Sequence, residues 1–346
     1  MRAPALLSTI LLCTTLLSCR NAADGQWQGK IADREGVKHV TNEGNGVDAG
    51  KVTEEVKAIW TYGSPQSGAQ MMWVDFDPAG NVFALDYRDQ KVLKLDRNGA
   101  RQGELGTRGQ GPGQLSKSRR FAWVDGRLYF ANEGNGRIEV LGEKGDGGSS
   151  VELPEVERPG ELYFANDRFY VARRFVANGS FVHTYDRNWK LTSALRAADK
   201  QEDRLDSLRS FNTVCPAKDG VWIVYMMMNR IQKVGWDGKV LLETSRDLDW
   251  KFPVDNKTGK VIPEILVHRA CAVDPSGNLY VVYSNPENWK RGNDVYKFGP
   301  DGRLRQKAFT LPIFNATMIR FDGEGHLFFS DGATLTKATI ERRSAS

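Results

Sequence analysis

Four histidines are the residues best suited to metal binding or acid–base catalysis, namely His39, His183, His268 and His326. No two of them have the close spacing that would place two imidazoles on one face of a strand or helix. His268 precedes a segment expected to be an innermost strand, which makes it the best single candidate ligand-binding residue. The alternative for His268 is an ordinary structural role. We predict no metal site and no cofactor.

Nucleophilic catalysis has no local signature, because the sequence contains no Gly-x-Ser-x-Gly segment. Asp-x-x-Gly segments begin at Asp77, Asp96 and Asp274, and a similar turn begins at Asp301, which Gly302 follows directly. They lack the dense alternating carboxylates of a calcium loop, so we interpret them as hairpin turns. Catalytic residues are left unassigned.

Arginines are the most numerous candidate ligand-binding residues in the sequence. Some lie at or just before expected innermost strands, and these are Arg119, Arg120, Arg209, Arg269 and Arg320. Others follow the aromatic strands described below, and these are Arg88, Arg137, Arg173, Arg174, Arg230 and Arg291. Guanidinium groups that converge on one face could bind a carboxylate, phosphate or sulfate. The alternative is that each pairs with a nearby Asp or Glu on the rim. The ligand-binding candidates are Arg120, Arg209, Arg269, Arg320, Arg137 and Arg230.

Two apolar segments could add to such a face. The loop 284–294 contains Trp289, which we select as an exposed aromatic contact for a sugar or a protein. Met226–Met228 could form an adaptable apolar patch. For both segments the alternative is plain packing.

A repeat of short strands must position these residues. Aromatic residues stand at the centres of similar apolar segments at positions 83, 129, 170, 222, 280 and 328, which are 41 to 58 residues apart. A period of this length with about four short strands per unit is typical of propeller blades. Thin units of this kind must stack around an axis to bury both faces. We predict an all-β, six-bladed β-propeller of four-stranded antiparallel blades.

The predicted ring closes through its two chain ends. The last unit has three expected strands, at 316–321, 327–330 and 334–340. Val52–Trp60 is strand-like and has no partner near it in the sequence. We therefore predict that this N-terminal strand completes the last blade and removes an exposed sheet edge. The propeller is expected to cover 51–341, followed by a tail at 342–346.

The segment Gly106-Thr107-Arg108-Gly109-Gln110-Gly111-Pro112-Gly113-Gln114-Leu115 closely resembles the inter-blade motif of NHL-repeat proteins and of related six-bladed propeller lipoproteins of bacteria. The resemblance implies a long connection over the propeller rim, with glycines at positive φ. The proline that usually follows the motif is replaced by Ser116-Lys117-Ser118-Arg119. This family includes binding scaffolds, lyases and lactonase-like relatives, so it specifies the fold more than the activity.

The N-terminus has the features of an export signal. Met1-Arg2 is followed by an apolar run, Ala5–Leu17, that is too short to span a bilayer. Leu16-Leu17-Ser18-Cys19 resembles the lipobox of bacterial lipoproteins, which implies that Cys19 carries a lipid and begins the mature chain. The alternative is an ordinary signal peptide. Arg20 points to the outer membrane in a Gram-negative host. Residues 20–50 are expected to be a flexible tether.

Two cysteines remain in the predicted propeller, Cys215 and Cys271. Each falls in an expected innermost strand, in adjacent blades. A disulfide needs Cα atoms within about 7 Å, and we expect such strands to lie farther apart than that. The prediction is therefore two separate, buried, reduced thiols.

Composition and charge limit the classes of partner. The 346 residues are 40% hydrophobic and 26% charged, which fits a globular protein and excludes a polytopic membrane protein or a largely disordered chain. The net charge is +5, and the basic residues form no block that would indicate nucleic-acid binding. We expect a lipid-anchored cell-envelope binding or scaffold module whose propeller face takes a protein, a carbohydrate or an anionic small molecule. The alternative is an enzyme working in the propeller channel, of lyase or lactone-hydrolase type.

Overall fold

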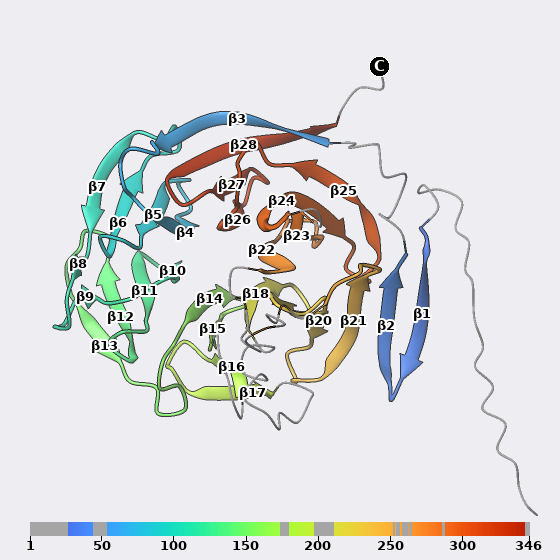
Figure 1. Cartoon of the computed structure of the whole chain (residues 1–346). Coiled ribbons are helices and arrows are strands. Elements are labelled where there is room, and N and C mark those ends of the chain that lie inside the picture. Colours follow the sequence, from blue (N-terminus) through green and yellow to red (C-terminus); the bar gives the residue numbers. More distant parts are fainter. Residues whose placement is uncertain are drawn as a thin grey trace, which may run out of the picture.

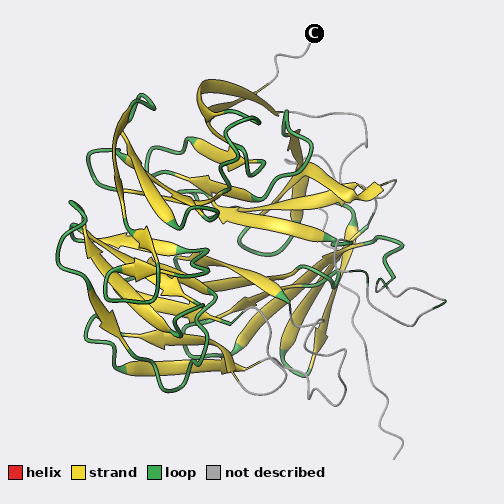
Figure 2. Ribbon diagram, turned by 60° about the vertical axis from the view of Figure 1, so that its left-hand side comes forward, coloured by secondary structure: helices red, strands yellow, loops and turns green. Residues whose placement is uncertain are grey.

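The computed structural model describes residues 27–43, 54–173, 180–196, 211–251, 265–285 and 288–342, together with the single positions 253, 257 and 262. Within these residues six sheets surround a common axis, and each contributes four antiparallel strands to the ring (Figure 1). Figure 2 shows that strands and their connecting loops make up the described chain. None of it forms a helix long and apolar enough to cross a membrane. The predicted six-bladed propeller is confirmed.

The blades follow one another along the chain, and each runs from an innermost to an outermost strand. Blades 1 and 2 consist of β4 (Met71–Phe76), β5 (Val82–Asp86), β6 (Lys91–Leu95), β7 (Arg101–Leu105), then β10 (Phe121–Val124), β11 (Arg127–Asn132), β12 (Arg137–Gly142) and β13 (Ser149–Val151). Blades 3 and 4 consist of β14 (Glu161–Ala165), β15 (Arg168–Ala172), β16 (Ser180–Tyr185), β17 (Leu191–Arg196), then β18 (Asn212–Ala217), β19 (Gly220–Tyr225), β20 (Ile231–Val234) and β21 (Val240–Arg246). Blades 5 and 6 consist of β22 (His268–Val273), β23 (Leu279–Asn285), β24 (Asn288–Phe298), β25 (Leu304–Thr310), then β26 (Met318–Phe321), β27 (Leu327–Ser330), β28 (Thr334–Arg342) and β3 (Glu54–Gly63).

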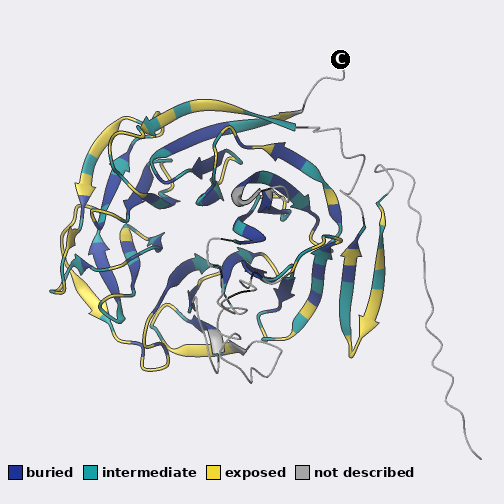
Figure 3. Ribbon diagram, in the orientation of Figure 1, coloured by how far each residue is buried: buried dark blue, intermediate teal, exposed yellow. Residues whose placement is uncertain are grey.

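The repeated aromatic residue lies in the second strand of each blade. Phe83, Tyr170, Trp222, Tyr280 and Phe328 are buried there, because this strand is covered by a neighbouring blade on each face. Exposure is concentrated in outermost strands such as β7 and β13 (Figure 3). The innermost strands lie at the opposite side of each blade from these exposed strands, and they line the axis.

The two chain ends meet in blade 6. β3 pairs antiparallel with β28, from Glu54 opposite Arg342 to Gly63 opposite Thr334. This is the pairing predicted for the segment 52–60. Blade 6 is joined in turn to blade 1, because Arg320 donates to Asp75 at 2.6 Å and Ser330 Oγ donates to the Met71 carbonyl at 2.9 Å.

An N-terminal hairpin extends blade 4, which corrects the expectation of a flexible tether. β1 (Gly29–Arg34) pairs with β2 (Val37–Asn42), and β2 lies parallel to β21 (Figure 1). The Asn42 side chain is fully buried. Its Nδ2 donates to Thr244 Oγ1 at 2.9 Å, and its Oδ1 accepts from the Leu304 amide at 2.7 Å. The sequence around this asparagine looked too polar to pack, but the polar atoms are satisfied by the sheet edge.

The glycine-rich segment 106–115 forms the connection between blades 1 and 2, as the resemblance implied. Gly106 and Gly113 both have φ of +76°, which favours glycine over residues with a Cβ. Within the connection, β8 (Thr107–Arg108) pairs in parallel with β9 (Gln114–Leu115). The loop is therefore folded on itself beside blade 2.

Cys215 and Cys271 form a disulfide, so the prediction of two reduced thiols is wrong. Their Cα atoms lie 6.2 Å apart, one on β18 and one on β22. The innermost strands of adjacent blades converge toward the axis, and at this point they approach more closely than the prediction assumed. The bond links blades 4 and 5 across 56 positions of the sequence.

Candidate functional site at the channel mouth

Two cavities lie at opposite ends of the propeller axis. One cavity has a volume of about 170 Å³ and is lined by residues at or near the starts of the innermost strands. We call it the channel mouth. The other, of about 190 Å³, is lined mainly toward the ends of these strands. The described residues that line the channel mouth are Met72, Arg119, Arg120, Glu161, Thr213, Met226, Leu266, Arg269, Asn315, Ala316 and Thr317. All six blades contribute to this set, through their innermost strands or the segments next to them, so the ring itself assembles the site.

Arg120 and Glu161 form the buried polar centre of the channel mouth. Arg120 Nη1 donates to the Met72 carbonyl at 2.9 Å, and its Nη2 lies 3.7 Å from Glu161 Oε1. Glu161 Oε2 accepts from Tyr163 Oη at 2.7 Å and from Thr213 Oγ1 at 3.3 Å. Burial raises the pKa of the Tyr163 phenol, which therefore stays protonated and donates. Both carboxylate oxygens are thus engaged by fixed partners.

Trp73 connects the two ends of the channel. The guanidinium of Arg120 lies 4.3 Å from the centre of the Trp73 ring, and that of Arg320 lies 4.8 Å from it. Arg120 lines the channel mouth, whereas Arg320 lines the opposite cavity and pairs with Asp75. The predicted cluster of arginines is therefore divided between two cavities, since Arg120 lines the channel mouth and Arg320 lines the opposite cavity, on either side of Trp73.

Arg269 enters the channel mouth from β22. Its Nε donates to Ser284 Oγ at 2.8 Å, and burial lowers the pKa of the guanidinium to about 10, so it remains charged at neutral pH. A Cβ at Gly292 would overlap the Arg269 Cδ atom. The glycine therefore leaves the space in which the arginine stem lies.

His268 precedes Arg269 but does not reach the cavity lining. It is fully buried, and its Nδ1 lies 2.6 Å from the Tyr225 carbonyl. Burial lowers the pKa of the imidazole to about 4, so the ring is neutral and Nδ1–H donates to that carbonyl. His268 therefore has the ordinary structural role that was the alternative to ligand binding.

Arg137 and Arg230 also have carboxylate partners, as the alternative for the arginines anticipated. Arg137 Nε donates to the fully buried Glu139 at 2.8 Å, while its Nη2 donates to the carbonyls of Gln110 and Gly111. Arg230 Nε donates to Glu243 at 2.7 Å. Arg137 thus holds the glycine-rich connection against blade 2.

Several predicted residues lie outside what the structure describes. These are Cys19, Arg174, Arg209 and the side chains of Trp289 and Arg291.

Of the methionine run, Met226 lines the channel mouth, while Met227 is buried against Leu266. Glu161 was not among the predicted site residues, although an acidic residue at the start of an expected innermost strand was a usable signal.

One group of residues in the described chain has metal-ligand geometry. Atoms of Asp322, Glu324 and His326 lie within 4.8 Å of one another, in the turn between β26 and β27. Asp322 already accepts from His326 Nδ1 at 2.9 Å and from the His326 amide at 2.8 Å. These are the bonds of a closed turn, so the hydrogen bonds within the turn account for this arrangement.

Comparisons with known proteins give the fold. No family model and no curated protein matches this chain. A solved structure from Bacteroides fragilis, of a protein inferred to be exported, has 9% identity and a TM-score of 0.60, covering 88% of this chain and 100% of its own. A streptogramin B lyase has 14% identity and a TM-score of 0.55, covering 80% of this chain and 81% of its own. A gluconolactonase from Xanthomonas campestris has 14% identity and a TM-score of 0.52, covering 83% of this chain and 90% of its own. At these identities the likeness establishes the propeller fold and transfers no activity.

Proposed function

We propose that this chain is a lipid-anchored cell-envelope binding module, related to the NHL-like propeller lipoproteins of bacteria, that receives an anionic group at its channel mouth. The anionic group belongs to a partner protein or to a small acidic ligand. The ring supplies a rigid support, and the loops at the mouth supply the contacts.

One observation carries this proposal. Three arginines, Arg119, Arg120 and Arg269, line a cavity in which Glu161 is the only carboxylate among the described lining residues. Met226 and Leu266 add an apolar wall. Guanidinium groups held in partly buried positions bind carboxylates with paired hydrogen bonds, and low local polarity strengthens the attraction. A cavity of about 170 Å³ suits one acidic side chain or a small acid.

Site-specific photocrosslinking in intact cells tests the proposal. A photoreactive residue at Met72 places the reporter in the mouth, and the same residue at Arg127, the first residue of β11, places it on the opposite face. We expect a discrete adduct from position 72, absent from position 127 and lost when Arg269→Gln is added. Equal adducts from both faces, or an adduct that survives Arg269→Gln, contradict binding at the mouth.

Export and anchoring have separate support. A disulfide is typical of proteins in oxidising compartments, and Cys215 and Cys271 form one. The lipobox-like ending at Cys19 supports a lipid anchor, and Arg20 supports the outer membrane. Cys19→Ser is expected to release the protein from the membrane fraction without loss of fold. A Cys19→Ser protein that stays membrane-bound and acylated rules the anchor out.

A further inference from the structure

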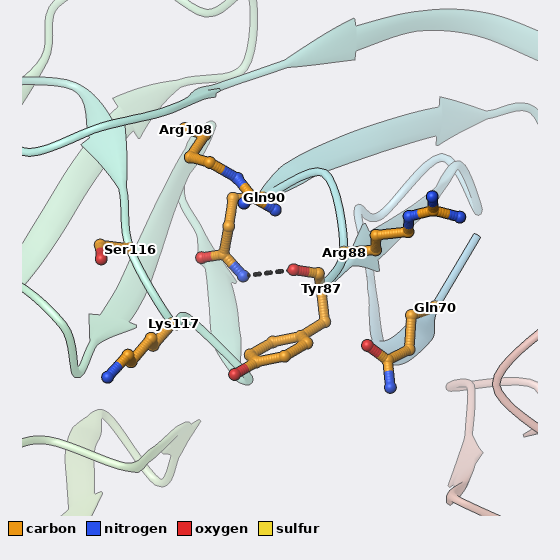
Figure 4. Close-up of a pocket in the computed structure, with 7 residues that line it drawn as sticks. All are labelled: Gln70, Tyr87, Arg88, Gln90, Arg108, Ser116 and Lys117. Atoms are coloured by element: carbon orange, nitrogen blue, oxygen red, sulfur yellow. Dashed lines mark hydrogen bonds between the residues drawn. The ribbon is translucent and has the colours of Figure 1, made fainter. Parts of the chain in front are cut away.

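A further cavity opens on the same face of the propeller as the channel mouth. It lies away from the axis, between blade 1 and the connection to blade 2. It has a volume of about 420 Å³, and we call it the side pocket. Arg88 comes from the loop between β5 and β6, whereas Arg108 and Lys117 come from the connection. Figure 4 shows Tyr87 and Gln90 between these two groups. The side pocket was not predicted from the sequence, because its residues come from two separate segments.

Among the described residues, the three cations of the side pocket have no acidic partner. In the described part of the chain, no carboxylate oxygen lies within 4.0 Å of Arg88, Arg108 or Lys117, and none of the described residues that line the pocket is acidic. Arg88 Nη1 donates to the Gly68 carbonyl at 2.9 Å. All three side chains are exposed. This differs from Arg120, Arg137 and Arg230, each of which faces a carboxylate. Three like charges around one cavity repel one another, and a bound anion removes that repulsion.

The floor of the side pocket is held rigidly by Gln90, which is buried. Its Oε1 accepts from the Ser118 amide at 2.7 Å, and its Nε2 donates to the Tyr87 carbonyl at 2.6 Å. These bonds tie the β5–β6 loop to the connection. Arg119 covers the Tyr87 ring at 4.3 Å and donates to its hydroxyl at 3.1 Å. Binding would therefore need little ordering beyond the exposed cationic side chains, which favours affinity.

We propose that the side pocket binds a phosphorylated sugar. A phosphate ester carries close to two negative charges at neutral pH, whereas a carboxylate carries one, so phosphate matches three unpaired cations better. Gln70 and Ser116 line the same cavity and offer donors and acceptors for sugar hydroxyls. The volume falls in the usual range of small-ligand pockets, about 300–1,000 Å³. This site is separate from the channel mouth, and its occupation does not depend on the function proposed there.

Calorimetric titration of the full chain tests the proposal with three probes: fructose bisphosphate, inorganic phosphate and fructose. We expect fructose bisphosphate to bind more tightly than inorganic phosphate, fructose not to bind, and added salt to weaken binding. Equal affinity for fructose bisphosphate and inorganic phosphate would mean that only an anion is recognised and would overturn the sugar assignment. Binding of fructose as tight as that of fructose bisphosphate would overturn the role of the cations.

Charge reversal locates the binding. Arg108→Glu combined with Lys117→Glu should weaken fructose bisphosphate binding by roughly 30-fold, because two charge-assisted contacts become repulsive. The matched control is Arg127→Glu with Arg168→Glu, which changes the net charge equally in exposed hairpins on the opposite face. This control and Arg269→Gln at the channel mouth should bind normally. Equal weakening by the control pair means general electrostatic attraction, and weakening by Arg269→Gln places the ligand at the mouth; either result rejects the side pocket.

Discussion

His268 illustrates how burial decides the role of a single residue. Its imidazole lies between the Tyr225 carbonyl and the Tyr283 ring, and it packs edge-on to that ring at 4.5 Å. Protonation would place a charge in a fully buried position with Arg246 nearby, which is why the pKa falls. The residue that looked most like a ligand in the sequence is instead a neutral hydrogen-bond donor in the blade 4–blade 5 contact.

The first prediction concerns the pH dependence of stability. The unfolded chain protonates this imidazole near pH 6.5 and the folded chain only near pH 4, so the unfolded state binds more protons between these values. The contribution of His268 is therefore complete above pH 6.5 and is lost as the pH falls toward 4, by up to about 3 kcal/mol. His268→Asn keeps a donor for Tyr225 without titrating. Melting temperatures measured from pH 7 to 4 should fall less steeply for this variant, and parallel curves would contradict the assignment.

At the scale of elements, an ion pair on blade 2 helps to hold the glycine-rich connection in place. Arg137 reaches two loop carbonyls, and its partner Glu139 accepts from the Gly113 amide at 2.6 Å. The loop is also the wall that carries Arg108 and Lys117. Its conformation therefore sets the shape of the side pocket.

The second prediction is that Arg137→Gln lowers the free energy of unfolding by about 3 kcal/mol, because it leaves the buried Glu139 carboxylate without its cation. Urea titration of the variant measures this loss. Adding Glu139→Gln removes the uncompensated charge, so the double variant should be more stable than Arg137→Gln alone. A double variant whose loss is the sum of the two single losses shows that the residues are not coupled.

The N-terminal strands have two distinct roles, since β3 completes blade 6 and the β1–β2 hairpin covers the edge of blade 4. Covered edges remove unpaired backbone groups that otherwise attract other chains. The hairpin also buries Asn42, whose side chain joins blades 4 and 5 through Thr244 and Leu304.

The third prediction compares two truncations. Deleting 20–45 should lower the melting temperature but leave a folded ring, whereas deleting 20–63 should unfold or aggregate the chain because blade 6 loses a strand. Asn42→Ala should account for about 1–3 kcal/mol of the smaller effect, through buried groups left unpaired. Lys30→Ala is the matched change in the hairpin and should have no measurable effect, because its pair with Glu43 is exposed. Equal melting temperatures for the two truncations would reject the role of β3 in closing the ring.

At the scale of the whole molecule, ring closure is reinforced at two places. β3 completes blade 6, and the Cys215–Cys271 disulfide cross-links blades 4 and 5 close to the axis. A cross-link between positions 56 residues apart restricts the unfolded chain, which in the chain-entropy account is worth about 4 kcal/mol.

The fourth prediction is that replacing both cysteines by alanine lowers the free energy of unfolding by about 2–4 kcal/mol. Adding a reductant should shift the melting temperature of the wild-type chain downward and leave that of the double variant unchanged. Peptide mapping without reduction should recover the peptides of Cys215 and Cys271 as one linked species. Recovery of these peptides separately, each with a free thiol, would show that the bond does not form in solution.

The repeat was readable from the sequence because every blade needs the same buried second strand. The aromatic residues at 83, 129, 170, 222, 280 and 328 mark that strand and predicted the number of blades. The pairing of the chain ends was predicted because the last unit lacks a fourth strand. The glycines of 106–115 likewise predicted a connection, since positive φ at Gly106 and Gly113 is a local requirement.

The site was only partly readable, because it depends on which side chains from different blades come together. The sequence placed Arg120, Arg269 and Arg320 near innermost strands, but only the closed ring puts the first two at the channel mouth and the third beside Asp75. It could not reveal the pairing of Arg137 with Glu139, the packing of Asn42 or the approach of Cys215 to Cys271. Sequence periodicity determines which residues are buried within a blade, whereas distances between blades arise only when the ring closes, and those distances decide which charges remain unpaired.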